Sequence, residues 1–397
     1  MLLLAPASLG FHEMSSTNLS QEKGTFVGRL WVPGTGPVLV CLRDGVLFDI
    51  TSREAPTMRD LLEMDNPVRY VNSIENARLD TLAELEADSL SAECNVLARH
   101  FLAPNDLQSV KAAGVTFAKS MVERVIEERA AGDPRVAESI RLRLGDLIGS
   151  SLSNITPGSK QAERVKEALK QEGLWSQYLE VGIGPDAEVF SKAQILSAVG
   201  WGAPVGLHPK SVWNNPEPEI VLAVNSAGTI QGASIGNDVN LRDFEGRSAL
   251  LLSKAKDNNA SASIGPFIRL FDDSYSLDDV RKAELTMTVT GVDGYILQGR
   301  SLMNEISRDP ADIVKQVINE NHQYPDGFML YLGTLFAPTD DRDTPGEGFT
   351  HKIGDRVEIS ATGLGTLTND VRNCGDCAPW TFGPSAFMRN LAARNLI

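Results

Sequence analysis

The chain has 397 residues, which at about 100–200 residues per domain predicts two domains, or one large domain with an appendage. Hydrophobic residues make up 42% and charged residues 22%, so a largely disordered chain is excluded. The net charge of −15 argues against a general nucleic-acid binder, whose surface would be basic. An anionic substrate would therefore need a metal ion or local lysines to hold it.

The sequence shows no sign of a membrane or secretory segment. No apolar run reaches the roughly 18–20 residues of a membrane-spanning helix. The first residues, MLLLAPASLG, are apolar but short and lack a basic flank, so we expect no secretory signal, and Met14 could be an alternative start. The four cysteines are too few for a disulfide scaffold and favour a cytoplasmic protein. Cys374 and Cys377 form one CxxC without a second pair, which does not indicate a zinc site.

In chain order, residues 24–50 alternate short apolar runs with Gly/Pro turns and predict a small antiparallel meander. Helical spacing follows over about 57–97. Residues 119–180 are charged and amphipathic, with one helix predicted from the cap Ser159 to the stop signal Gly173. This segment could cover a site, or it could be a solvated helical pair without a role in chemistry.

From about Ala187 the pattern becomes β-rich. Six or more short, β-branched runs are separated by Gly, Asn and Asp, with one clear helix at PADIVKQVINEN. These runs predict a twisted mixed or antiparallel sheet that curls on itself.

Three carboxylates are candidate metal ligands. Glu217 and Glu219 are two residues apart at the start of a strand, so their side chains point the same way, with about 6.5–7 Å between Cα atoms. A divalent cation would neutralise them, and oxygen ligands favour Mg²⁺ or Mn²⁺. Asp238 could be a third ligand. The alternative is an acidic turn before a strand, with Arg242 and Asp243 as an ordinary surface ion pair.

Other residues could hold an anionic substrate. Lys254, between strands, is a candidate counter-charge, although a solvated loop lysine is the commoner case. The turn Gly333-Thr334 could offer N–H groups and one hydroxyl to a carboxylate.

Five motifs occur together in a characteristic order. They are E-P-E at 217–219, N-D-V at 237–239 with Arg242-Asp243, the 254–257 segment with Gly265-Pro266, L-G-T at 332–334, and G-D-R-V-E-I at 354–359 with 363–371. Their order and spacing over about 185–372 resemble the fumarylacetoacetate hydrolase superfamily. The resemblance implies an α+β fold with a mixed β-roll or barrel-like catalytic domain, a divalent metal, a 2-oxo acid or β-diketone substrate, and a homo-oligomer, dimer or tetramer. It also implies an N-terminal α/β domain at 1–105 and a catalytic domain at 106–397, with 119–180 as a helical lid.

Within the superfamily the chain is most similar to the 2-keto-3-deoxy-D-arabinonate dehydratases, through A-E-V-F-S-K at 187–192 and S-V-W-N-N-P-E-P-E at 211–219. In that family a proline precedes the glutamate where Ala187 stands here. The resemblance implies Mg²⁺ or Mn²⁺ bound by Glu217, Glu219 and Asp238. It also implies that Glu188 is the candidate proton acceptor, that Lys254 neutralises the enolate or the substrate carboxylate, and that the substrate contacts are Phe117, Lys192, Gly333 and Thr334.

One departure separates two activities. Hydrolases of the superfamily carry G-x-N-Y-x-x-H-x-x-E, in which a His–Glu pair activates water. Residues 114–123 keep the glutamate as Glu123 but have Ser120 in place of the histidine, so water lacks a base of suitable pKa. We therefore expect a dehydratase that forms 2,5-dioxopentanoate. The alternatives are a C–C hydrolase of a 2,4-diketo acid and a non-catalytic oxo-acid binder.

Overall fold

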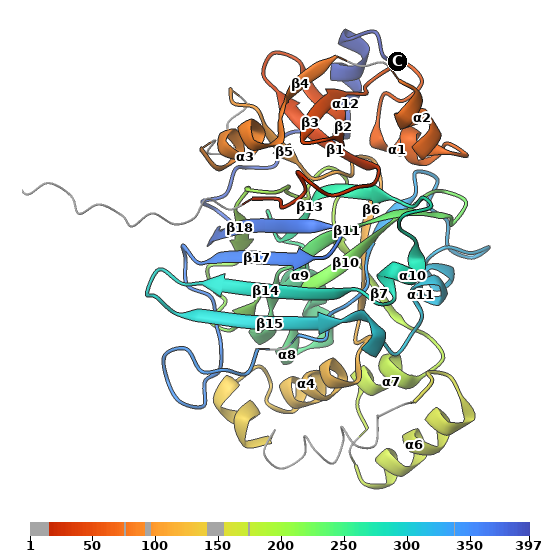
Figure 1. Ribbon diagram of the computed structural model, residues 1–397. Coiled ribbons are helices and arrows are strands. Elements are labelled where there is room, and N and C mark those ends of the chain that lie inside the picture. Colours follow the sequence, from red (N-terminus) through yellow and green to blue (C-terminus); the bar gives the residue numbers. More distant parts are fainter. Residues whose placement is uncertain (1–15, 75–76, 92–96, 141–154, 174, 337) are drawn as a thin grey trace, which may run out of the picture.

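The computed structural model describes residues 16–397 except 75–76, 92–96, 141–154, 174 and 337 (Figure 1). Residues 1–13, Met14 and Cys94 lie outside the described residues. Helices and two large sheets make up the chain, which confirms the α+β class. The larger sheet has free ends at β4 and β7, and the described strands form no closed barrel, so the barrel-like part of the prediction is wrong. No helix in the described part is long and apolar enough to cross a membrane.

The predicted N-terminal meander is present, and the helical region after it is interrupted. The elements here are β1 (Phe26–Val32), β2 (Gly36–Arg43), β3 (Val46–Asp49), α1 (Met58–Leu62), α2 (Pro67–Ser73), β4 (Arg78–Thr81), α3 (Leu82–Ser91) and β5 (His100–Leu102). Asn66 caps α2 and Pro67 occupies its first turn, so a new helix starts there and does not continue α1.

The larger sheet connects this meander to the remainder of the chain. Its other strands are β6 (Ser109–Gly114), β7 (Glu188–Ala193), β10 (Pro218–Val224), β11 (Ile230–Asp238), β13 (Ala262–Leu270) and β16 (Phe328–Tyr331). The strand order is β4-β3-β2-β1-β13-β11-β10-β16-β6-β7, with β5 paired to β1. β1 and β13 pair antiparallel, so the regions 1–105 and 106–397 share one sheet; the boundary between them stays a prediction.

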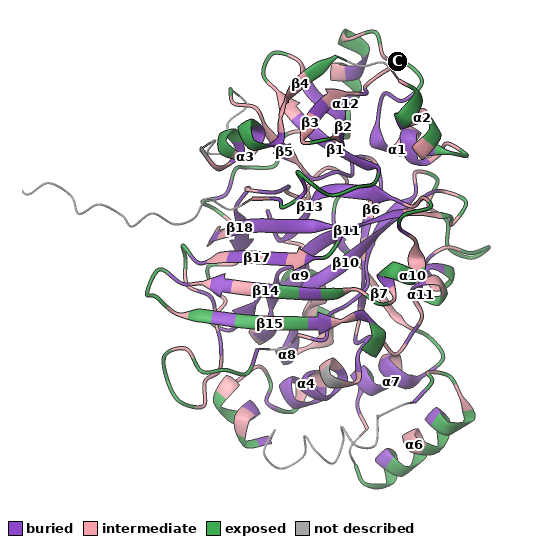
Figure 2. Ribbon diagram, in the orientation of Figure 1, coloured by how far each residue is buried: buried purple, intermediate pink, exposed green. Residues whose placement is uncertain are grey.

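The sheet centre is buried on both faces. All seven residues of β10 are buried (Figure 2). Ile220, Leu222 and Val224 join one apolar cluster, while Val221 and Ala223 join another. Because side chains alternate along a strand, the two clusters lie on opposite faces of the sheet. A strand covered on both sides gives a rigid base to the carboxylates at its start.

A second sheet packs beside the first through β14, β17 and β18. Its strands, in the order β15-β14-β17-β18-β8, are β8 (Val205–Leu207), β14 (Glu284–Thr290), β15 (Ile296–Leu302), β17 (Arg356–Ala361) and β18 (Gly365–Asn373). The remaining short elements are β9 (Asn214–Asn215), β12 (Asn240–Leu241), α8 (Arg242–Arg247), η1 (Ala249–Leu251), α9 (Leu252–Lys256), α10 (Leu277–Val280), η2 (Met303–Glu305), α11 (Pro310–Val317) and α12 (Pro384–Ala393). Helix α12 returns to the N-terminal strands, where Asn390 Nδ2 donates to the carbonyl of Thr35 at 2.7 Å.

Three helices gather at one end of the molecule, beyond the sheets (Figure 1). They are α4 (Ala118–Arg129), α6 (Lys160–Gln171) and α7 (Gln177–Ile183). Helix α6 has the predicted ends: the side chain of Ser159 accepts from the Ala162 N–H, and Gly173 has a φ of +66° just beyond the helix. The group has its own apolar cluster, which includes Ile126 and Leu179. Its closing motion as a lid stays a prediction.

Candidate active site

The three predicted metal ligands lie together at one end of β10 and β11. In the antiparallel register Pro218 is paired with Asn237, near the end of β11. Glu217 and Glu219 are the neighbours of Pro218 in the chain, so both lie next to this end of β11. The Asp238 N–H donates to the Glu217 carbonyl at 3.0 Å, which fixes this end of the ribbon. One carboxylate oxygen from each of Glu217, Glu219 and Asp238 lies within 4.8 Å of the others. Their exposed fractions are 5%, 2% and 1%.

Two lysines compensate part of this negative charge. Lys256 Nζ lies 2.6 Å from Glu217 and 2.9 Å from Asp238. Lys192 Nζ lies 2.7 Å from the other oxygen of Asp238. Burial opposes ionisation of Asp238, but the two lysines outweigh it and lower its pKa. The two lysines therefore favour the ionised form of Asp238.

Glu219 has a different environment. It accepts the Gly333 N–H at 2.7 Å, and in the described part of the chain no lysine or arginine pairs with it. Burial, followed by repulsion from Asp238 and Glu217, raises its pKa well above the usual value. A divalent cation held by the three carboxylates would supply the missing positive charge, and an all-oxygen donor set suits a hard cation. The residues present therefore fit a divalent metal.

The turn after β16 depends on glycine. Gly333 has a φ of +89°, and a Cβ there would lie 2.0 Å from Thr116 Oγ1. Thr116 itself donates to the Leu332 carbonyl at 2.7 Å. The Gly333 N–H is thus used on the protein carboxylate of Glu219. Thr334 lines the cleft and its hydroxyl oxygen accepts the Phe336 N–H at 3.1 Å.

The structure places Lys254, the lysine chosen from the sequence, away from the three carboxylates. Lys254 is exposed and lines a separate surface hollow. Residues 252–256 form helix α9, and two residues on a helix are rotated by about 200°, so Lys256 faces the carboxylates while Lys254 faces solvent. The alternative of a solvated lysine therefore applies to Lys254. If S-K-A-K at 253–256 is interpreted as a helix, Lys254 and Lys256 are expected to face different directions.

Two further predicted substrate contacts do not line the cleft. Lys192 is fully buried, forms an ion pair with Asp238 and donates to the Val239 and Lys256 carbonyls. Phe117 is a buried residue preceding α4 and lies in the main apolar cluster. Lys192 therefore positions Asp238, and Phe117 packs in the core.

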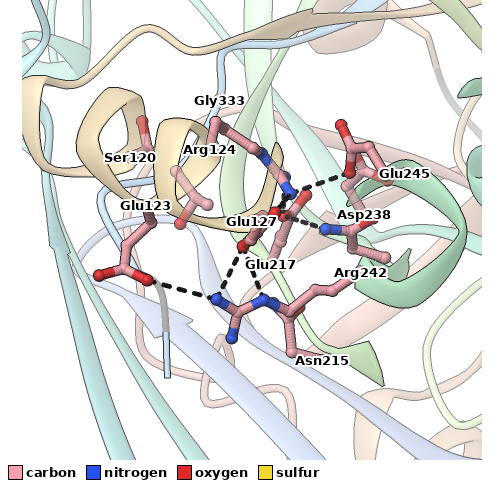
Figure 3. A network of polar contacts seen from close by, with 12 residues as sticks. Ser120, Glu123, Arg124, Glu127, Asn215, Glu217, Asp238, Arg242, Glu245 and Gly333 are labelled. Atoms are coloured by element: carbon pink, nitrogen blue, oxygen red, sulfur yellow. Dashed lines mark hydrogen bonds and ion pairs between the residues drawn. The ribbon is translucent and has the colours of Figure 1, made fainter. Parts of the chain in front are cut away.

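Helix α4 contributes an arginine that sequence reasoning missed. The guanidinium of Arg124 lies 2.7 Å from Glu127, 2.8 Å from Glu217 and 2.9 Å from Glu245 (Figure 3). These three carboxylates raise the pKa of Arg124 well above its usual value, although burial opposes this. The spacing of Arg124 and Glu127 in ERVIEER fits a helical ion pair. The contact of Arg124 with Glu217, by contrast, joins segments 93 residues apart.

Arg242 is also buried, which overturns the surface ion pair with Asp243. Its guanidinium lies 2.7 Å from Glu127 and 3.4 Å from Glu123 (Figure 3). It also stacks on the ring of Trp213, 4.2 Å from the ring centroid. Asp243 instead accepts from the Ser211 hydroxyl at 2.7 Å and from the Val212 N–H at 3.0 Å. The two adjacent residues brace different parts of the site.

Glu188 lies at the start of β7, opposite Gly114 on β6. A Cβ at position 114 would lie 2.1 Å from a Glu188 carboxylate oxygen, so the glycine provides the space for this side chain. Burial, followed by the negative charge of Glu245, raises the pKa of Glu188 to about 7. A carboxyl with that pKa exchanges protons readily at neutral pH.

The hydrolase dyad has no counterpart in this geometry. Ser120 donates its hydroxyl hydrogen to the Phe117 carbonyl one helical turn earlier, at 2.9 Å. Glu123 lies against Arg242. No histidine lines the cleft within the described part of the chain. A water molecule here lacks an imidazole base.

One cleft brings together Glu188, Lys256, Arg124, Arg242, Thr334 and the three candidate metal ligands. Its lining combines charged groups with a few polar and aromatic side chains. The residues are Ala113, Gly114, Val115, Ser120, Glu123, Arg124, Glu127, Glu188, Phe190, Asn215, Glu217, Glu219, Asp238, Asn240, Arg242, Glu245, Lys256, Gly333, Thr334 and Phe336.

Comparison with known proteins agrees with this architecture. Residues 197–372 match the model of the fumarylacetoacetate (FAA) hydrolase C-terminal family. A Haloferax volcanii protein named probable 2-keto-3-deoxyxylonate dehydratase is 27% identical over 334 residues, which are 84% of this chain and 94% of the relative. The 2-dehydro-3-deoxy-D-arabinonate dehydratase of Saccharolobus solfataricus is 30% identical over 188 residues, which are 47% of this chain and 58% of that relative.

Solved structures share the fold. A 2-keto-3-deoxy-D-arabinonate dehydratase, described as complexed with magnesium and 2,5-dioxopentanoate, has a TM-score of 0.60 at 20% identity, covering 88% of this chain and 99% of that one. A fumarylacetoacetate hydrolase from Exiguobacterium antarcticum has a TM-score of 0.52 at 16% identity, with coverages of 88% and 99%. Because both a dehydratase and a hydrolase match, the fold does not distinguish the two activities. The distinction between dehydration and hydrolysis has to come from the residues of the site.

Proposed function

We propose that the protein is a metal-dependent dehydratase that converts a 2-keto-3-deoxy-pentonate, of the D-arabinonate type, to 2,5-dioxopentanoate and water. The observation that carries the proposal is one cleft that combines the Glu217–Glu219–Asp238 triad with Glu188. The triad fits Mg²⁺ or Mn²⁺, and Glu188 has a pKa near neutrality. The names of the relatives from Haloferax volcanii and Saccharolobus solfataricus support the same reaction class.

The residues divide the reaction between charge stabilisation and proton transfer. When bound, a divalent cation would supply Lewis acidity to the C2 keto oxygen of the substrate. Glu188 accepts a proton from C3, and the negative charge moves to the C2 oxygen, close to the ammonium of Lys256. The C4–O bond then breaks, and the departing hydroxyl takes the proton back from Glu188 as water. This elimination leaves a C3=C4 double bond. Loss of a proton from C5 and return of one to C3 move the double bond to C4–C5, and this enol tautomerises to the C5 aldehyde. The net change is the loss of one water molecule.

Substrate anchoring falls to the turn after β16. Thr334 lines the cleft, and its hydroxyl oxygen already accepts the Phe336 N–H, so its hydrogen is available to donate to the substrate carboxylate. Arg124 and Arg242 already form ion pairs with protein carboxylates. Neither is therefore the first choice to bind the substrate carboxylate. The same cleft disfavours C–C hydrolysis, because Ser120 stands where a water-activating histidine would be needed.

A substrate panel tests the proposal. The protein with Mg²⁺ is incubated with 2-keto-3-deoxy acids and, separately, with 2,4-diketo acids. We expect an aldehyde product from a five-carbon 2-keto-3-deoxy acid and no cleavage of the diketo acids. Pyruvate plus a second acid from a diketo substrate would identify a hydrolase. Ser120→Ala serves as a control and should retain dehydration within about tenfold, since a hydroxyl is no base at neutral pH.

A further inference from the structure

Two asparagines face each other across the short β9–β12 ribbon beside the triad. Asn215 on β9 is the register partner of Asn240 on β12. Both side chains line the cleft, and their exposed fractions are 2% and 0%. Asn215 is labelled in Figure 3, the close view of the ion-pair network. Neither asparagine has a part in the reaction as described above.

The direction of each amide is fixed by its hydrogen bond. Asn240 Nδ2 donates to Glu217 Oε1 at 3.1 Å, and Asn215 Nδ2 donates to the Pro216 carbonyl at 2.9 Å. A carbonyl and a carboxylate can only accept, so the NH₂ group of each amide has to point toward them. The two Oδ1 atoms are consequently acceptors, and in the described part of the chain neither has a hydrogen-bond donor.

A buried carbonyl oxygen without a donor is unfavourable, so such a pair selects ligands that bring donors. Much of the cleft is lined by carboxylates, which are also acceptors. We propose that Asn215 and Asn240 form a hydroxyl-binding subsite, whose amide oxygens accept hydrogen bonds from the terminal hydroxyl end of a 2-keto-3-deoxy sugar acid. This inference deepens the proposed function and rests on it for the placement of the keto acid end at the triad.

The subsite explains a choice between substrate classes. A 2-keto-3-deoxy-pentonate carries hydroxyl groups at C4 and C5, each with a hydrogen to donate. A 2,4-diketo acid offers carbonyl oxygens there, which leave both amide oxygens unpaired. A site built to hydrogen-bond a hydroxyl discriminates strongly against an analogue that lacks it. In this proposal the β9–β12 ribbon recognises the hydroxyl end of the substrate, which the metal and Glu188 do not contact.

The test is a thermodynamic cycle in which the Asn215 side chain and the C5 hydroxyl of the substrate are changed separately and together. Asn215 is the better position, because Asn240 also bonds the metal ligand Glu217. The kcat/KM for water loss is measured with 2-keto-3-deoxy-pentonate and with 4-hydroxy-2-oxopentanoate, which lacks only the C5 hydroxyl. Wild type, Asn215→Leu and Asn215→Asp are compared; Asn215→Asp keeps an acceptor in place. If Asn215→Leu does not fold, Asn215→Ala removes the same oxygen without adding bulk.

We expect wild type to prefer the hydroxylated substrate at least tenfold, Asn215→Asp to keep most of that preference, and Asn215→Leu to reduce it to within about threefold. An equal preference in wild type and Asn215→Leu would overturn the subsite. Binding of both acids to the Mg²⁺-supplied protein is measured in parallel by calorimetry. A hydroxyl preference in binding that Asn215→Leu abolishes, without turnover of either acid, would support the subsite while refuting the dehydratase. Turnover with no hydroxyl preference in any variant would support the dehydratase and refute the subsite.

Discussion

Lys254 and Lys256 lie on the same short helix, yet only Lys256 faces the carboxylates, which makes them a matched pair for mutation. Lys256→Met removes a positive charge beside the C2 oxygen, and we expect kcat to fall by about 10²–10³. Lys254→Met should stay within about twofold of wild type. Steady-state kinetics with saturating Mg²⁺ measures both, and circular dichroism checks that each variant is folded. Equal losses in the two variants would contradict the assignment of Lys256.

Glu188 should set the acidic limb of the pH profile. A base has to be deprotonated to accept the C3 proton, and burial together with Glu245 raises the pKa of Glu188 to about 7. Activity should therefore rise with pH up to neutrality and then level off. A bound cation favours the ionised form, so the limb in the metal-loaded enzyme lies at or below pH 7.

The variant Glu188→Gln should lose about 10²–10⁴ in kcat, and its residual activity should lack this limb. The measurement is kcat from pH 5 to pH 9 for both proteins. A limb that persists unchanged in Glu188→Gln would assign it to another group. Gly114→Ala offers an independent check, because a methyl group there displaces the Glu188 carboxylate while leaving its chemistry intact.

The sequence contained local information about these residues and little about their distant partners. Glu217 and Glu219 could be paired because their two-residue spacing on a strand already decides their direction. Lys256 was missed because the helical conformation of 252–256 was not recognised. Arg124 and Glu245 were missed because their contact depends on how α4 packs on α8, which no local pattern encodes.

At the level of elements, the loop before β17 braces the β9 strand. The His351 N–H donates to Asn214 Oδ1 at 3.2 Å. The loop itself is held by Asp355, which accepts from Arg342 at 2.6 and 2.8 Å and from His351 at 3.1 Å. Burial opposes ionisation of Asp355, but these donors outweigh it and lower its pKa to about 2.

Asp355→Asn should destabilise the protein far more than Asp293→Asn. Both carboxylates contact Arg342, but the Asp355 side chain is 0% exposed and that of Asp293 is 32% exposed. Breaking the buried pair leaves Arg342 poorly compensated and should cost about 3–5 kcal/mol in unfolding free energy. The pair with Asp293 should contribute far less, because solvent screens the exposed carboxylate. Chemical denaturation at pH 7 measures both, and equal losses would contradict the bracing role.

The pH dependence of this brace has a definite sign. Because the pKa of Asp355 is lower in the folded state than its usual value of 3.8, its stabilisation is fully present above about pH 4. It is lost as the pH falls toward 2. Wild type and Asp355→Asn should therefore converge in stability on acidification, while remaining separated at neutral pH.

The helical group α4, α6 and α7 offers an element-scale test of the lid prediction. Helix α4 already supplies Arg124, Glu123 and Glu127 to the cleft wall. If the group closes over the substrate to exclude water, hydrogen exchange in residues 118–129 and 160–183 should slow when Mg²⁺ and the substrate fragment pyruvate are added. The N-terminal strands β1–β3 serve as the internal reference. Unchanged exchange in the helices would show that the group is a fixed wall.

For the molecule as a whole, the fold class and the triad followed from sequence, whereas the extent of the large sheet did not. The pairing of β1 with β13 joins residues more than 200 apart, and α12 returns to the N-terminal strands through Asn390. Strand periodicity identifies each strand but not its neighbour. The homo-oligomeric state stays a prediction, which the mass of the particle in solution would test.

Metal binding connects the site to the stability of the whole chain. In metal-free protein the raised pKa of Glu219 favours its protonated form, whereas the lowered pKa of Asp238, which is paired with Lys192 and Lys256, favours its ionised form. Glutamine resembles the protonated carboxyl in shape and charge. Glu219→Gln should therefore unfold close to the wild-type temperature in EDTA. Asp238→Asn should unfold earlier even without metal, because two buried lysines lose their partner.

Mg²⁺ should then separate wild type from both variants. Binding to the folded state alone stabilises it by RT ln(1 + [Mg²⁺]/Kd), about 2.7 kcal/mol at one hundred times Kd, which wild type gains and Glu219→Gln loses. Since Glu219 has to release its proton to bind, the stabilisation should grow as the pH rises from 6 to 8. Thermal unfolding with EDTA and with graded Mg²⁺ measures each step. A Mg²⁺ shift of equal size in wild type and Glu219→Gln would mean that the cation binds elsewhere, and the triad would no longer account for the metal requirement.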